Sequence, residues 1–151
     1  MQLIKLVIIS AFAFFLLLTA FTLFIPSQIR ISRAIDITAE RKEVLPLVQQ
    51  LDNWKSWNAY LQDSSGRFRI SLTEISDSLV TSNWVAGDKE FASGLAIYEA
   101  RQGTITVQWY FDFRLKWYPW EKIASIVYDR QMGGPMEESL VKLKERIESN
   151  P

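Results

Sequence analysis

Apolar residues are distributed differently at the start of the chain and in the rest of it. From Leu6 to Ile25 no residue is charged and most are apolar. As a helix rising about 1.5 Å per residue, this segment spans about 30 Å, which matches the hydrocarbon core of a bilayer. It is longer than the apolar region of a signal peptide, and residues 18–20 form a poor cleavage site. The pattern predicts an uncleaved transmembrane anchor over residues 1–26, with Pro26 at its end.

After the anchor, apolar and polar residues alternate along several short segments. Gln28–Ile37 alternates with period two, which predicts a strand with four isoleucines on one face. Pairs of turn residues separate four further strand-like segments, which are Phe68–Ile75, Leu79–Val85, Phe91–Glu99 and Thr104–Leu115. The last segment alternates most strictly, so one of its faces must be buried while the other can meet water.

Helical patterns flank these strands. Thr38 is the expected cap of a helix that runs to about Gln50, and Asp52-Asn53 is the expected cap of a short helix that holds two tryptophans. At the C-terminus, a helix is predicted to open at Gly133-Gly134-Pro135, because Pro suits the first helical turn. Apolar residues then recur at helical spacing along one face, which needs a sheet to lie on. We therefore expect a single α+β domain over residues 27–151.

The composition excludes several classes of function. Lys and Arg number 17, as do Asp and Glu, so the chain lacks the basic surplus of a nucleic-acid-binding protein. Cysteine and histidine are both absent, which excludes a thiolate nucleophile, an imidazole base and a zinc site of the usual kinds. No cofactor, no metal ligand set and no catalytic residue is assigned.

Three segments together resemble the START-like helix-grip fold of the SRPBCC superfamily, which includes polyketide cyclase/dehydrase and lipid-transport-like proteins. They are Ile35–Ala39 leading into Val44 and Leu47, the paired-tryptophan segment Leu51–Trp57, and Thr106–Trp109 followed by Pro119 and Pro135–Lys144. The resemblance implies an antiparallel sheet that wraps around the long C-terminal helix. Some bacterial members also carry a short N-terminal membrane helix. Only ten residues separate Trp57 from Phe68, and we count five strands where the family commonly has six or seven.

The resemblance also implies a cavity between the sheet and the C-terminal helix. Its expected lining residues are Leu95, Ile97, Trp109, Phe111, Phe113, Met136, Leu140 and Leu143. Ligand sites of small molecules are usually preformed and largely apolar, which suits this set. The alternative is that these side chains fill the core, because a domain of this size needs most of its apolar residues to fold.

Arg33 is a further candidate for the cavity, because it shares a face with the isoleucines of the first strand. Its guanidinium must extend to solvent, pair with a carboxylate or face a polar group of a ligand. We favour solvent exposure through a bulge at Ser32-Arg33.

Trp117, Tyr118 and Trp120 form an aromatic cluster beside Lys116 and Lys122. Trp and Tyr favour the membrane–water boundary, so these three residues are candidates for contact with lipid. The alternative is that the cluster packs beneath the C-terminal helix and stiffens the turn.

The function that these features favour is a membrane-anchored, non-catalytic domain that binds a hydrophobic small molecule or lipid. A cyclase- or hydratase-like enzyme is the first alternative, but no carboxylate lies on the apolar face of Thr104–Leu115, and Glu99 alone shares the phase of Leu95 and Ile97. A structural or protein-interaction domain with a filled core is the second. Only Lys5 precedes the anchor whereas several basic residues follow it, which favours a cytoplasmic domain.

Overall fold

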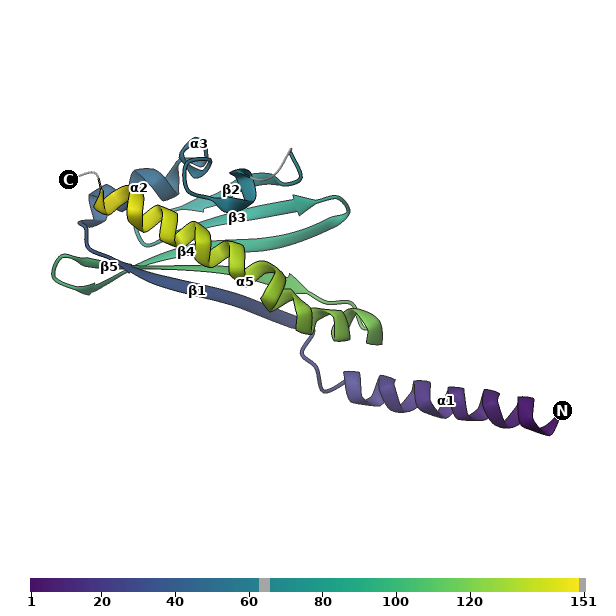
Figure 1. Cartoon of the computed structure of the whole chain (residues 1–151). Helices are drawn as coiled ribbons and strands as arrows, with labels where there is room; N and C mark the ends of the chain where they lie inside the picture. The colour runs from purple at the N-terminus through teal and green to yellow at the C-terminus, as the bar shows by residue number, and fades with distance from the viewer. Residues whose placement is uncertain (63–65, 150–151) are drawn as a thin grey trace.

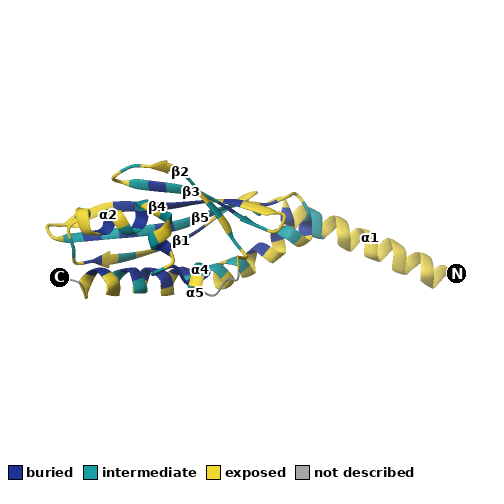
Figure 2. Cartoon of the chain, turned by 90° about the horizontal axis from the view of Figure 1, so that it is seen from above, coloured by how far each residue is buried: buried dark blue, intermediate teal, exposed yellow. Residues whose placement is uncertain are grey.

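The computed structural model describes residues 1–62 and 66–149, and it begins with an apolar helix that projects away from the rest of the chain (Figure 1). This helix, α1 (Gln2–Thr22), is long and apolar enough to cross a membrane, and its only charged residue is Lys5. Its side chains are exposed along nearly the whole length, so packing within the protein does not explain its composition (Figure 2).

A five-stranded antiparallel sheet follows, as the alternating pattern predicts. Its strands are β1 (Gln28–Ile37), β2 (Arg69–Ile75), β3 (Leu79–Ala86), β4 (Lys89–Arg101) and β5 (Thr104–Arg114). They lie in the order β1-β5-β4-β3-β2, so the first strand pairs with the last and consecutive hairpins form the remainder. At the β3–β4 turn, Gly87 has φ 63°, a left-handed conformation that glycine adopts without steric cost.

Between β1 and β2, the described residues form three short helices. They are α2 (Arg41–Gln49), α3 (Leu51–Trp54) and α4 (Ala59–Gln62). The cap of α2 is Glu40, which forms a capping box with Glu43, and the expected cap Thr38 instead donates its backbone N–H to Glu148 Oε1 at 2.8 Å. The predicted cap was therefore wrong, because the helix begins at Arg41, beyond the first turn that Thr38 could cap.

The C-terminal helix α5 (Pro119–Glu148) begins well before the predicted start at Gly133. Pro119 occupies the first turn, where a missing N–H costs little. Pro135 lies inside the helix, which changes direction in its middle, as expected where a proline interrupts the hydrogen-bond ladder (Figure 2). Ser139 Oγ donates to the Pro135 carbonyl at 2.6 Å and supports this region. Below, the first half of α5 is Pro119–Met132 and the second half is Gly133–Glu148.

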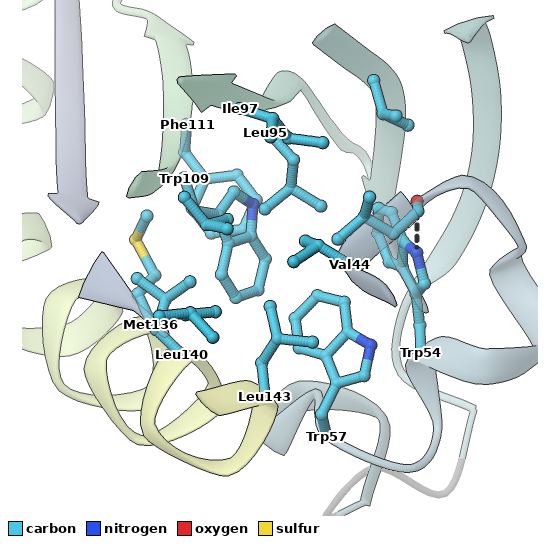
Figure 3. Packing of buried hydrophobic residues seen from close by; sticks show 14 of the residues in the cluster. Val44, Trp54, Trp57, Leu95, Ile97, Trp109, Phe111, Met136, Leu140 and Leu143 are labelled. Atoms are coloured by element: carbon cyan, nitrogen blue, oxygen red, sulfur yellow. Dashed lines mark hydrogen bonds between the residues drawn. The ribbon is translucent and has the colours of Figure 1, made fainter. Parts of the chain in front are cut away.

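The core lies on one face of the sheet, beneath α2 to α5. Odd-numbered residues of β5 point into it, as the alternation predicts, and they meet side chains from the second half of α5 (Figure 3). Four fully buried tryptophans occupy the centre, and these are Trp54, Trp57, Trp84 and Trp109. Each indole N–H donates to an acceptor within 3.0 Å, so these large side chains are buried without leaving a donor unpaired.

Candidate functional site

Most of the residues predicted to line a cavity lie in the packed core. The buried members of the set are Leu95, Ile97, Trp109, Phe111, Met136, Leu140 and Leu143 (Figure 3). The ring of Trp109 lies 5.8 Å from those of Trp57 and Tyr60 and 5.1 Å from that of Phe111, measured between centroids. Aromatic rings thus fill the space beside the second half of α5. As ligand contacts, these residues remain predictions.

A cavity of about 420 Å³ lies beside the first half of α5, and we call it the α5 cavity. It is bounded by the β3–β4 turn, the end of β5 and the helix. Its aromatic and apolar lining consists mainly of Phe68, Phe91, Phe113, Tyr128 and Met132. The Phe113 ring lies 4.8 Å from Phe91 and 5.6 Å from Tyr128, so strand and helix side chains form one continuous wall. Of the sequence-predicted residues, Phe113 is the one in this wall.

The rim of the α5 cavity is charged, and two of its charged side chains, Lys89 and Glu121, have partners nearby. Lys89 Nζ donates to the Tyr128 hydroxyl at 3.3 Å and lies 5.6 Å from the centre of the tyrosine ring. This contact joins the β3–β4 turn to α5 across the cavity. Glu121 accepts the backbone N–H of Lys116 at 2.7 Å. The arrangement provides an apolar interior with polar groups at its edge, which is the usual design of a small-molecule site.

A second hollow of about 610 Å³ shares Phe68 and Met132 with the α5 cavity and lies against α4. Tyr60 lines this hollow, and its hydroxyl donates to the Met132 carbonyl at 2.5 Å. Burial raises the pKa of Tyr60 well above its ordinary value, although the charge of Arg33 opposes the shift. Tyr60 therefore remains a protonated donor that holds the middle of α5 against the core.

Arg33 faces α5 and is paired with carboxylates. Its Nε lies 2.8 Å from Glu137 Oε1 and its Nη2 lies 3.1 Å from Asp129 Oδ1. The β1–β5 register continues without interruption through Ser32 and Arg33, so the expected bulge was wrong. Gly133 makes this inward placement of Arg33 possible. It leaves room for the guanidinium beside α5, whereas a Cβ at that position would overlap Arg33 Nη2. Burial lowers the pKa of Arg33, but the hydrogen bonds to Asp129 and Glu137 outweigh this effect and raise it.

The aromatic cluster stands at the start of α5. Trp117 and Trp120 are 68% and 63% exposed, and Tyr118, half-buried, stacks between them with ring centroids 4.9 Å from each. The two tryptophans thus project from the surface and do not pack beneath the helix. Whether they contact lipid remains a prediction.

Several lining residues of the α5 cavity were missed in the sequence. Phe91 has the same phase as Leu95 and Ile97, so the alternation of β4 contained the signal. Tyr128 and Met132 continue the four-residue spacing of Met136 and Leu140 towards the N-terminus. Placing the helix start at Gly133 excluded them. Among residues 1–62 and 66–149, no three His, Cys, Asp or Glu side chains come together as metal ligands would.

Comparison with known proteins identifies the fold. No protein-family model matches the sequence, and neither does any curated protein. Among solved structures, a START superfamily protein from Mycobacterium smegmatis matches 81% of this chain and 99% of its own, with a TM-score of 0.64 and 14% identity. The chain has a START-like fold.

Two further START-like neighbours support this assignment. Norcoclaurine synthase from Thalictrum flavum, solved with dopamine and hydroxybenzaldehyde, matches 82% of this chain and 88% of its own at a TM-score of 0.62 and 8% identity. CalU16 from Micromonospora echinospora matches 81% and 76% at a TM-score of 0.60 and 15% identity. At such low sequence identities, the structural likeness establishes the fold alone.

Proposed function

We propose that this START-like protein is tethered to a membrane by α1 and binds a hydrophobic small molecule or lipid in the α5 cavity, without converting it. The observation that carries the proposal is the cavity itself, about 420 Å³ in volume with an aromatic and apolar wall and a charged rim. This volume is within the range of about 300–1,000 Å³ that is typical of small-molecule sites.

The chemistry of the lining indicates what kind of molecule would fit. Phe91 and Phe113 offer adjoining aromatic surface, while Lys89, Gln131 and the Tyr128 hydroxyl offer polar groups near the edge. A ligand with an apolar body and one polar end would bury the body against the rings and leave the polar end at the rim. Such a molecule is amphipathic, as many membrane lipids and their fragments are.

Binding without turnover is favoured over an enzymatic role. One START-like neighbour is a synthase, solved with two small aromatic molecules, so the fold accommodates catalysis. In this chain, the rim carboxylates Glu90 and Glu121 accept hydrogen bonds from the Asn83 amide and the Lys116 backbone, and the third lining carboxylate, Asp88, is exposed in the β3–β4 turn. A general acid or base must be positioned against the reacting group, and Glu90 and Glu121 are committed to local structure.

The tether places the α5 cavity close to a membrane. Residues 23–27 connect α1 to β1 and, at about 3.5 Å per residue, reach at most about 17 Å. The excess of Lys and Arg after α1, including Arg30 and Arg41, favours a cytoplasmic location for the domain. Labelling of a Lys42→Cys variant by a membrane-impermeant maleimide tests this: protection in intact cells and reaction after lysis are expected.

Photolabelling tests the ligand site. The full chain is reconstituted in lipid nanodiscs with a photoactivatable fatty acid, and the cross-linked peptides are mapped by mass spectrometry. Cross-links on β4, β5 and the Tyr128 side of α5 are expected, along with those on α1. Met132→Trp should reduce labelling of the cavity peptides by filling the space, and Val127→Trp, which adds the same ring on the exposed side of α5, should not.

The other outcomes separate the alternatives. Labelling confined to α1 would favour a structural or protein-interaction domain with a filled core. The proposed protein releases its ligand without converting it. Recovery of a chemically altered ligand would therefore favour the cyclase- or hydratase-like enzyme.

A further inference from the structure

The first half of α5 carries apolar side chains on the face that points away from the domain. Trp120, Ile123 and Val127 follow helical spacing along this face, with Ile126 beside them and Trp117 just before the helix begins, and all five are 46–70% exposed. We call these five residues the outward face of α5. A row of large apolar side chains in water is costly, and such patches mark contact surfaces.

The start of α5 is attached to the end of α1. Lys122, only 5% exposed, directs its Nζ at the Thr22 and Ile25 carbonyls, at 3.0 and 2.8 Å. These carbonyls lie at the C-terminal end of α1, where a helix lacks internal partners and a cation is stabilising. The same contact buries Thr22. The outward face is therefore held beside the point where α1 ends and, by the proposed anchoring, leaves the bilayer.

We propose that the outward face of α5 lies in the headgroup region of the bilayer that α1 spans, so that the first half of α5 is an interfacial helix. The inference rests on the proposed membrane anchoring. The lipid surface is the fitting occupant because α1 ends there, because Trp117 and Trp120 have the side chain that is enriched at that depth, and because Lys116 adds a cation that anionic headgroups attract.

This placement also sets the orientation of the α5 cavity. Lys116 and Glu121 line the cavity, and their neighbours in sequence, Trp117 and Trp120, belong to the outward face. The rim of the cavity then lies at the level of the lipid headgroups. An amphipathic molecule can move from the bilayer into the cavity without crossing open water.

Site-directed spin labelling tests the inference, and the absence of cysteine makes every introduced cysteine unique. Full-length Ile123→Cys and Val127→Cys variants are labelled with a nitroxide and reconstituted in vesicles of phosphatidylcholine and phosphatidylglycerol. Labels at both positions should collide more with oxygen and less with a water-soluble nickel complex than a label at Val141. Val141 is the matched control, since it is a 45% exposed apolar residue on the second half of the same helix. A label at Leu16 reports on α1.

The outcomes separate failure of this inference from failure of the anchoring. Equal nickel accessibility at positions 123, 127 and 141, with a lipid-immersed label at Leu16, would overturn the interfacial placement and leave the anchor intact. A water-accessible label at Leu16 would overturn the anchoring and the inference together. Strong spin–spin broadening at Ile123 that grows with protein density would show that a second copy covers the face, which also overturns the lipid assignment.

Discussion

In the second half of α5, Met136, Leu140 and Leu143 point into the core, and Glu138 and Glu145 face solvent. Five helical turns, or about 18 residues, bring a helix back to the same side. Five turns before these two glutamates, the first half has Trp120 and Val127, which are both exposed. Its buried polar positions are Lys122 and Ser125.

One helix thus has two kinds of environment. The second half is an ordinary amphipathic helix whose apolar side lies on the sheet and whose charged side meets water. The beginning of the first half reverses this distribution, with Lys122 and Ser125 turned inward and Trp120, Ile123 and Val127 turned outward, before Tyr128 and Met132 resume the inward apolar side. A helix of the first half's composition is unfavourable in water, but it suits a membrane surface beside a transmembrane anchor.

Removal of α1 should have the largest effect, because it takes away the membrane anchor beside the first half of α5. We expect the full chain to remain in the membrane fraction after alkaline carbonate washing, because Leu6–Ile25 is an uncharged bilayer-length segment. A chain that begins at Ser27 should fold and be released by carbonate, with weak, reversible binding to vesicles through the outward face. Sedimentation followed by immunoblotting measures both. Full-length protein in the soluble fraction, or a mature N-terminus near Phe21, would contradict the prediction.

A charge on the buried side of the second half should have the next largest effect. Leu143 is fully buried, so Leu143→Asp places an unpaired carboxylate in the core and should lower the free energy of unfolding by several kcal/mol. Lys142→Asp, on the solvated side, loses one ion pair with Glu138 and should cost less than about 1 kcal/mol. Urea unfolding in detergent micelles measures the difference. Equal losses would show that the helical phase is wrong.

Much of the fold was predictable because apolar and polar residues alternate along a strand that has one buried and one solvent-exposed face. β5 is the clearest case, with Ile105, Val107 and Trp109 buried and their neighbours on the other face. The first half of α5 was missed for a physical reason. Its first inward positions are Lys122 and Ser125, so the apolar period that reveals a helix on a sheet is absent there and begins only at Tyr128.

The candidate site was less predictable than the fold. Phase along a strand shows which side chains point inward, but not which of them leave space between them. Trp57, Trp84 and Trp109 meet from three separate elements and fill the centre, and this depends on packing that no single segment encodes. The α5 cavity lies instead at the end of the sheet, where Phe91 and Phe113 face Tyr128.

Enlarging side chains should distinguish the packed half of α5 from the exposed half. Leu140 is 1% exposed among aromatic neighbours, so Leu140→Trp should destabilise the fold by about 1–3 kcal/mol through overpacking. Val127→Trp adds the same ring where no core surrounds it and should change stability by less than about 0.5 kcal/mol. Thermal unfolding in micelles, followed by circular dichroism, measures both. A stable Leu140→Trp variant would indicate unfilled space beside the second half of α5 and would revive the predicted central cavity.

The smallest effects on stability are expected at the junction between the two halves of α5, where Gly133 and Gly134 form a matched pair. Gly134 has nothing within 4 Å of the place a Cβ would occupy, so Gly134→Ala should stabilise the helix by up to about 1 kcal/mol. At Gly133 a Cβ would overlap Arg33 Nη2 and displace the guanidinium from Asp129. Asp129 is 60% exposed, so weakening this ion pair should cost up to about 1 kcal/mol, and Gly133→Ala should stabilise the helix less than Gly134→Ala does.

A double-mutant cycle isolates the contact between strand and helix. In an Arg33→Ala background the guanidinium no longer occupies the space beside residue 133, so Gly133→Ala should become as stabilising as Gly134→Ala is in the parent chain. The two substitutions should therefore be coupled by up to about 1 kcal/mol. Urea unfolding of the four chains measures the coupling. Additive effects would mean that Arg33 moves aside at no cost and that Gly133 is not required where α5 crosses β1.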